Sequence, residues 1–354
     1  MSSGTRARGL VAALVGSTSL AVVLGGCGAS ARRDAPRRLA SVASPASVTT
    51  SASAPAPPAA IPATPAVTAL QAAITRQLAL AGPDTGALVY DLTAHRQLFA
   101  LRGAVKRPPA SVEKLYTSVA VLDRLGPGAR FHTAVLGAGH LGPGGVWHGD
   151  LYLRGDGDPT FGDGAFNRIW ENGYGPTAEQ LAAKLGARGI HRVTGLVIGD
   201  PSLFDAKRGG PSSGFAADVP DMGGQLAGLT YDHGAALRRL SPGAFAAREL
   251  MLTMRGAGIR SKAAKFTGRT PPDADTLASV SSPPTAVLLK LTDVPSDDFF
   301  AEMLTKRLGV QFGSGGSTAA GAAVIAGAIA ERGVHPQIVD GSGLSRKDRS
   351  SPLE

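Results

Sequence analysis

The sequence predicts a mixed α/β protein in which a helical part is interrupted by a region rich in short strands. Three observations support this fold class. Apolar residues recur every three or four positions in residues 107–125 and again after residue 280, which is typical of helices packed on a core. Residues 86–102, "GALVYDLTAHRQLFALR", have the pattern of two strands around a polar turn. Residues 131–280 contain short β-like runs separated by Gly-rich turns.

The first 27 residues have the pattern of an export signal. Arg6 and Arg8 precede the apolar run "GLVAALVGSTSLAVVLGG", and Cys27, the only cysteine of the sequence, follows small residues. The run is too short and wrongly flanked for a membrane-spanning helix. "LGGC" resembles the bacterial lipobox, which implies that Cys27 is lipidated. The alternative is a free cysteine inside a signal peptide that is cleaved further on.

Residues 28–66 contain few large apolar side chains and much Pro, Ser and Ala, so they bury too little surface to fold. We expect them to tether a globular domain to a membrane surface. The formal charge of +9 favours contact with anionic lipids or wall polymers. Binding of nucleic acid is disfavoured, because no aromatic residues interleave the basic ones.

The globular part is expected to be a domain split by an insertion. Its first part covers residues 67–130, an inserted β-rich subdomain covers residues 131–280, and its second part covers residues 281–354. Residues 67–82, "VTALQAAITRQLALAG", are predicted to form a helix that ends at a Gly-Pro pair. No internal repeat of fixed period is present.

Residues 107–125, "RPPASVEKLYTSVAVLDRL", place a serine and a lysine one helical turn apart. The two prolines fit before or at the first turn, so Ser111 is expected at the helix N-terminus with Lys114 within side-chain reach. The apolar residues of this helix form a stripe that we expect to face the core: Val112, Leu115, Val119 and Leu122.

This arrangement suits acyl transfer. A serine hydroxyl is a weak nucleophile at neutral pH and needs a neighbouring base. A lysine accepts a proton only as the neutral amine, which burial or a nearby cation favours. A helix N-terminus adds backbone N–H groups where an oxyanion develops. The alternative interpretation is an ordinary helix cap with a solvated lysine. The pair alone does not distinguish this from a catalytic site.

Four motifs follow one another in a characteristic order: "PASVEKLYT" around Ser111, then "GDGDPTF", then "SDDFFAEML" from Ser296, then "DGSGLSR" from Asp340. This series resembles the low-molecular-mass penicillin-binding proteins of the D-alanyl-D-alanine carboxypeptidase/endopeptidase family, which carry a large insert after the first motif. The resemblance implies a penicillin-recognising fold, an α/β/α sandwich around an antiparallel sheet. It also implies action on the D-Ala-D-Ala end of peptidoglycan stem peptides, binding of β-lactams, and no cofactor.

The resemblance implies a role for each matching position. Ser111 corresponds to the acylated nucleophile and Lys114 to its base. Ser296 corresponds to the second-motif serine, which relays a proton to the leaving amine. The implied substrate-binding positions are Asp298, Asp340, Gly341, Ser342 and Gly343.

The sequence departs from the family pattern twice. Asp298 stands where the family usually has asparagine, and an ionised aspartate accepts hydrogen bonds but donates none. Beside Lys114 it would hold the amine protonated and weaken it as a base. The third family motif, Lys-Thr-Gly, does not follow "DGSGLSR" in these 354 residues, and Lys265–Gly268, "KFTG", precedes Ser296 within the insert. We therefore expect either a truncated form of a longer protein or a degenerate member of the family.

Other patterns have simpler interpretations. "PSDDFFAEML" is also compatible with a helix start that Ser296 caps. Ser212 in "GPSSG" matches the nucleophile elbow of esterases, but it lies in a loop rich in Gly and Pro. "GDGDPTFGDG" resembles a calcium loop but lacks the closing Glu, which favours a turn. The seven histidines have no zinc-ligand spacing, so no metal site is predicted.

The sequence thus predicts an exported serine DD-peptidase on the outer face of the bacterial cytoplasmic membrane, in the wall, or in the periplasm. The alternative is a catalytically impaired lipoprotein that keeps the fold and binds wall peptides or a protein partner. The preference for carboxypeptidase or endopeptidase action and the oligomeric state stay open.

Overall fold

The computed structural model describes residues 64–234 and 240–354. The predicted export signal with Cys27 and nearly all of the predicted tether lie outside the described residues. Among the helices of the described part, none is long and apolar enough to cross a membrane.

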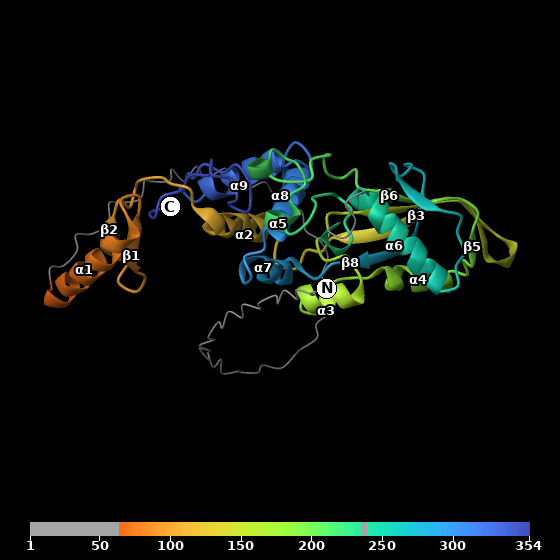
Figure 1. The fold of residues 1–354 in the computed structure, drawn as a ribbon, viewed down its shortest axis with the longest axis horizontal. Coiled ribbons are helices and arrows are strands. Elements are labelled where there is room, and N and C mark those ends of the chain that lie inside the picture. The colour runs from red at the N-terminus through yellow and green to blue at the C-terminus, as the bar shows by residue number, and fades with distance from the viewer. Residues whose placement is uncertain (1–63, 235–239) are drawn as a thin grey trace, which may run out of the picture. The chain divides into compact units, whose positions relative to one another are not determined.

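The described residues form helices and strands in mixed order, which confirms the predicted α/β class (Figure 1). The helices are α1 (Pro65–Leu78), α2 (Glu113–Arg124), α3 (Gly164–Trp170), α4 (Ala178–Ala187), α5 (Val219–Met222), α6 (Pro242–Gly256), α7 (Thr285–Asp293), α8 (Asp298–Phe312) and α9 (Thr318–Ala330). The strands are β1 (Ala87–Asp91), β2 (Arg96–Leu101), β3 (His132–Gly142), β4 (Val146–Gly155), β5 (Arg192–Val193), β6 (Val197–Asp200), β7 (Ala264–Thr267) and β8 (Asp275–Ser281).

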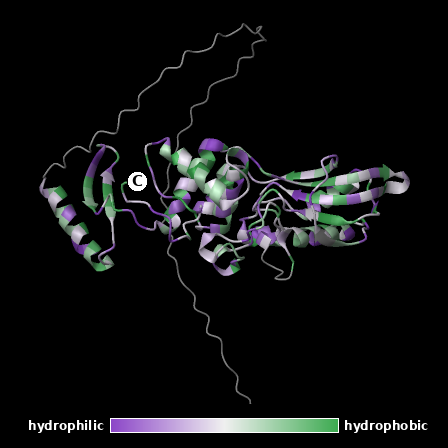
Figure 2. Ribbon diagram, turned by 90° about the horizontal axis from the view of Figure 1, so that it is seen from above, coloured by the Kyte–Doolittle hydropathy of each residue, from purple (hydrophilic) through white to green (hydrophobic). Residues whose placement is uncertain are grey.

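The first elements are a helix and a hairpin, as predicted. α1 begins after Thr64, whose hydroxyl accepts a hydrogen bond from the backbone N–H of Val67 at 3.3 Å. β1 and β2 pair antiparallel, with Ala87 opposite Leu101. α1 carries both hydrophilic and hydrophobic residues, and none of them is buried (Figure 2).

Six strands between residues 132 and 281 form one mixed sheet. Its order is β7-β6-β4-β3-β8, with β5 beside β4. β3 pairs antiparallel with β4 and β8, whereas β4, β6 and β7 run parallel. α4 and α6 pack against this sheet and each other, and the shared apolar core includes Leu151, Leu181 and Leu250. The "KFTG" segment falls on β7, at one edge of this sheet.

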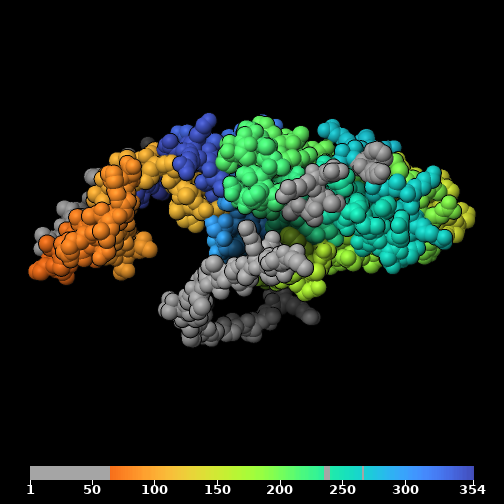
Figure 3. All heavy atoms as spheres, in the orientation of Figure 1, coloured from red at the N-terminus to blue at the C-terminus, as the bar shows by residue number. Residues whose placement is uncertain are grey.

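A second apolar core lies among α2, α7, α8 and α9. α8 is buried along most of its length, with Phe299 and Phe300 at its first turn. Three residues from the middle of the sequence also join this core: Phe204, Met222 and Leu226. In Figure 3 the green surface of this middle segment lies between the dark blue C-terminal residues and the teal strand-rich region. The chain therefore leaves the sheet after β6 and returns to the helical core before α6.

The prediction that the apolar stripe of α2 faces the core is wrong for three of its four residues, because only Val119 packs against the core. Val112, Leu115 and Leu122 are 58%, 57% and 44% exposed. The buried face of α2 instead carries four polar residues, Glu113, Lys114, Thr117 and Ser118, and becomes apolar only further along, at Ala120 and Val121. Because α8, α9 and the turn after residue 339 pack on that polar face, the apolar stripe lines an open groove of about 400 Å³.

Candidate active site

Ser111 lies in a short 3₁₀ turn, Ala110–Val112, that leads into α2. Pro109 comes directly before the turn, and Ala110 has a φ of 50°. A residue other than glycine rarely adopts this left-handed conformation, so the backbone beside Ser111 is strained. Ser111 itself is exposed, which leaves its hydroxyl open to an incoming carbonyl group.

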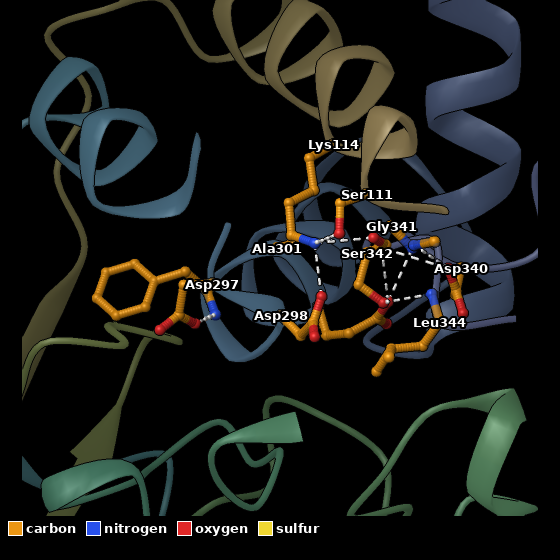
Figure 4. Close-up of polar contacts among 12 residues, drawn as sticks. Ser111, Lys114, Asp297, Asp298, Ala301, Asp340, Gly341, Ser342 and Leu344 are labelled. Atoms are coloured by element: carbon orange, nitrogen blue, oxygen red, sulfur yellow. Dashed lines mark hydrogen bonds and ion pairs between the residues drawn. The ribbon is translucent and has the colours of Figure 1, made fainter. Parts of the chain in front are cut away.

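Lys114 lies one turn further along α2 and is only 2% exposed. Its Nζ donates hydrogen bonds to Ser111 Oγ at 3.1 Å and to the carbonyl oxygen of Ser342 at 2.9 Å, and it forms an ion pair with Asp298 Oδ1 at 2.5 Å. Figure 4 shows these partners converging on the amine. An ammonium group has three N–H donors, and each has an acceptor here. The amine must therefore lose a proton before it accepts one from Ser111.

Asp298 is the first residue of α8, and its side chain is 19% exposed. Burial raises the pKa of its carboxyl group, while the contact with Lys114 works in the opposite direction. The close approach of Asp298 to Lys114 that the sequence suggested is therefore present. One carboxylate oxygen of Asp298 contacts the same amine that contacts the Ser111 hydroxyl.

Ser296 occupies the loop between α7 and α8 and is exposed. Its φ of 62° is left-handed, which again indicates local strain for a non-glycine residue. Among the described residues its hydroxyl makes no hydrogen bond to Ser111 or Lys114. The interpretation of Ser296 as the helix cap is wrong, because the carboxylate of Asp297 accepts the hydrogen bond from Phe300 N at 2.8 Å.

The predicted substrate-binding turn, residues 340–343, is shaped by Asp340. This carboxylate is fully buried, and its two oxygens accept hydrogen bonds from backbone N–H groups of Ser342, Gly343 and Ser345. Gly341 and Ser342 are buried as well. In this structure the turn therefore presents backbone to Lys114 rather than the Asp340 side chain to solvent.

Glu302 on α8 supports the turn from the other side, and the sequence analysis did not single it out. Its Oε1 accepts hydrogen bonds from Gly341 N at 2.8 Å and Ser342 N at 3.0 Å. Thr117 on α2 donates a hydrogen bond to the carbonyl oxygen of Gly341 at 2.8 Å. α2 and α8 thus fix the Ser342 carbonyl that accepts from Lys114. The only signal in the sequence was an acidic residue one helical turn after Asp298.

Glu113 is a second acidic group that the sequence analysis missed. It directly precedes Lys114 in the sequence, and its side chain is fully buried. Neither of its carboxyl oxygens has a hydrogen-bond partner among the described residues. Burial raises its pKa to about 9, and repulsion from Asp348, Asp340 and Glu302 adds to the effect. Burial also raises the pKa of Glu302 to about 8 and that of Asp348 to about 7. Glu113 is therefore protonated at neutral pH.

Gly343 brings the turn close to the backbone of the Ser111 loop. Its φ is 82°, and a Cβ atom at this position would lie 1.9 Å from the carbonyl oxygen of Ala110. An added methyl group must therefore push the backbone next to Ser111 out of place. The glycine is required both by its conformation and by this close approach.

We expect Gly343→Ala to lower the free energy of unfolding by about 2 kcal/mol or more and to slow any reaction at Ser111. Denaturant unfolding and acylation kinetics measure the two effects. Gly258→Ala is the matched control, because Gly258 has a φ of 83° but open space around its Cβ position. The control carries only the cost of the left-handed conformation, about 1 kcal/mol. Equal losses in both variants would show that the contact with Ala110 has no energetic weight.

The other predicted patterns have no catalytic geometry. Ser212 lies in the 3₁₀ turn Pro211–Ser213, and its hydroxyl makes no hydrogen bond to a base in the described part of the chain. It does not follow a strand, so the esterase interpretation is wrong. "GDGDPTF" is a turn in which Asp158 accepts hydrogen bonds from the backbone and hydroxyl of Thr160. Within residues 64–234 and 240–354, no three potential metal ligands are grouped to hold an ion.

Comparison with known proteins gives a family match that spans both parts of the described chain. The profile of the D-Ala-D-Ala carboxypeptidase 3 (S13) family matches residues 67–223 and 221–353. The chain belongs to this family. The resemblance predicted from the four motifs is therefore confirmed, and the S13 family accounts for both the helical part and the strand-rich region.

One known protein is similar to this chain in sequence, and another is similar in fold. A D-alanyl-D-alanine carboxypeptidase of Actinomadura sp. (strain R39) is 31% identical over 163 residues, which is 46% of this chain and 28% of that protein. Penicillin binding protein 4 of Haemophilus influenzae has a similar fold, with a TM-score of 0.65 and 18% identity over 78% of this chain and 75% of its own. The same protein complexed with a β-lactam gives a TM-score of 0.58 at 17% identity, covering 78% of this chain and 74% of its own.

Proposed function

We propose that this protein is an exported serine DD-peptidase that attacks the D-Ala-D-Ala end of peptidoglycan stem peptides through an acyl-enzyme on Ser111. The observation that carries the proposal is the contact between the exposed Ser111 hydroxyl and the buried amine of Lys114 at 3.1 Å. Membership of the S13 family supports the reaction class. β-Lactams are proposed as inhibitors, because they present a carbonyl group to the same serine.

In the proposed reaction the neutral amine of Lys114 takes the hydroxyl proton of Ser111 while Oγ attacks the carbonyl carbon of the D-Ala-D-Ala peptide bond. The tetrahedral intermediate collapses to an ester on Ser111, and the terminal D-Ala leaves with a proton on its amine. Ser296 is proposed to relay that proton. Water then attacks the ester while Lys114 takes its proton. The bond between the acyl carbon and Ser111 Oγ breaks, Lys114 returns the proton to Oγ, and the shortened peptide departs with a new carboxyl group.

The buried turn is proposed to support this chemistry rather than to bind substrate through side chains. Asp340 and Glu302 use their oxygens on backbone N–H groups. Those bonds hold the Ser342 carbonyl on Lys114, which orients the amine toward Ser111. Asp298 and the backbone of Gly343 are the groups of the predicted set with surface left for a substrate.

A second candidate function is a catalytically impaired lipoprotein that binds wall peptides or a protein partner. The ion pair between Lys114 and Asp298 favours it, because a carboxylate at 2.5 Å stabilises the protonated amine, which is not a base. In both proposals the protein is exported. Lipidation of Cys27 and attachment to an anionic membrane surface are part of both.

A fluorescent penicillin tests the proposal. We expect it to label the full chain at Ser111, as located by peptide mapping, and we expect Ser111→Ala to abolish the label. Ser212→Ala is the matched control and should label like the parent. Labelling that persists in Ser111→Ala would contradict the assignment of the nucleophile. A folded parent that binds D-Ala-D-Ala peptides but is never acylated would favour the second candidate function.

A further inference from the structure

A cleft of about 530 Å³ opens on the sheet of the strand-rich region, at the carboxyl ends of β4 and β6. Three of its lining residues form a row across neighbouring strands, with Ala134 opposite Arg154 and Arg154 opposite Asp200. Residues in register on adjacent strands lie on the same face of a sheet. Crevices at the carboxyl ends of parallel strands are the usual ligand sites of open α/β sheets.

The side chains of two arginines of the cleft make no polar contact with the residues that the structure describes. Arg154 and Arg269 both line it and are exposed. Within the described part of the chain, neither guanidinium group takes part in a hydrogen bond or an ion pair. A planar guanidinium group offers paired N–H donors that match a carboxylate or phosphate.

The acidic groups of the cleft, in contrast, are already bonded. Asp200 is 1% exposed and accepts hydrogen bonds from Ser202 N at 3.0 Å, Thr270 N at 2.7 Å and Thr270 Oγ at 2.6 Å. Asp156 pairs with Arg307 of α8 at 3.4 Å. The bonds from Thr270 also fix the backbone next to Arg269 at the rim of the cleft.

We propose that this cleft binds a carboxylate group of a wall peptide between the guanidinium groups of Arg154 and Arg269. A carboxylate suits the site better than a phosphate dianion, because Asp156 and Asp200 repel a second negative charge on the bound group itself, whereas the second carboxylate of a peptide diacid lies several atoms away. Ala134 leaves room over the sheet for the ligand. The choice of a wall peptide as the bearer of the carboxylate rests on the proposed function, whereas the anion chemistry rests on the cleft itself.

The test uses Ser111→Ala protein, so that turnover and acylation play no part. The probe is N-acetyl-L-alanyl-D-glutamate, which has free carboxylates but no D-Ala-D-Ala end. Its diamide and inorganic phosphate are the comparison ligands, and calorimetry or NMR titration measures binding. We expect the diacid to bind at least about tenfold more tightly than the diamide, and less tightly as salt is added.

Substitutions locate the binding. We expect Arg154→Gln with Arg269→Gln to weaken the diacid at least about tenfold, and Arg255→Gln, an exposed arginine on α6, to leave it unchanged. Ala134→Leu fills the cleft and should weaken binding without removing a charge. Equal binding by the double variant, or by the diamide, would overturn the proposal. Tighter binding of phosphate than of the diacid would overturn the assignment to a wall peptide. Failure of penicillin to label Ser111 would contradict the proposed function but not the binding of a carboxylate in the cleft.

Discussion

Asp298→Asn is expected to raise the rate of acylation of Ser111 at neutral pH by about tenfold or more. The Asp298 carboxylate lies 2.5 Å from the amine of Lys114 and stabilises its protonated form. Asparagine removes that charge and also supplies an N–H donor for a substrate carbonyl. The pH–rate profile of the variant should therefore be displaced from that of the parent.

Stopped-flow or gel-based kinetics with fluorescent penicillin, measured across pH, follow this effect. Asp297→Asn is the matched control, since it removes the same charge one residue earlier, where the carboxylate caps α8 through Phe300 N and does not contact Lys114. The control should keep the pH profile of the parent. An Asp298→Asn variant that is slower at every pH would show that the carboxylate assists the reaction.

Glu113→Gln is expected to stabilise the protein at alkaline pH. The pKa of Glu113 is raised from 4.5 to about 9 in the fold. Between these values the folded chain keeps a proton that the unfolded chain releases, so the free energy of unfolding falls as pH rises through this window. Glutamine has a similar shape but no ionisation. The free energy of unfolding of the variant, relative to that of the parent, should therefore be higher by on the order of 2–4 kcal/mol at the alkaline end of this pH range than at the acid end.

Denaturant unfolding at a series of pH values measures this difference. The remaining slope in Glu113→Gln comes from other carboxyl groups whose pKa values are raised, among them Glu302, Asp348, Asp158 and Asp232. Glu179→Gln, an exposed carboxyl on α4, serves as the control and should run parallel to the parent. If the free energy of unfolding of Glu113→Gln also runs parallel to that of the parent across pH, the pKa of Glu113 is not raised, and its carboxyl group must contact solvent or a proton acceptor.

Local patterns were enough to predict much of the candidate site. Spacing of three residues put Ser111 and Lys114 within reach, and the two prolines placed the serine at the start of the helix. Four motifs in order indicated the family, and the Asp298 side chain contacts Lys114 as the resemblance suggested. Each of these inferences depends on short-range geometry or on residues that the sequence displays directly.

The direction in which α2 is buried could not be predicted in the same way. The rule that apolar residues lie inside selected the stripe that is mostly exposed, whereas the first half of the buried face is polar and only Ala120 and Val121 make it apolar further along. Packing by α8, α9 and the turn after residue 339 buries Glu113 and Lys114 instead. A local sequence pattern cannot predict this burial, because the groups that contact the buried polar side chains of α2 come from the far end of the chain.

The sequence by itself determined the first helix, the hairpin, the helices after residue 280, the position of Ser111 and the family, because periodicity, turn residues and motif order are local properties. Only the tertiary structure decided that Glu302 and Asp340 hold the Ser342 carbonyl on Lys114, that Glu113 is buried without a partner, and that Arg154 and Arg269 share a cleft. The physical reason is the same in each case. Burial, charge and hydrogen bonding depend on which distant segments pack together, and those contacts arise only when the chain folds.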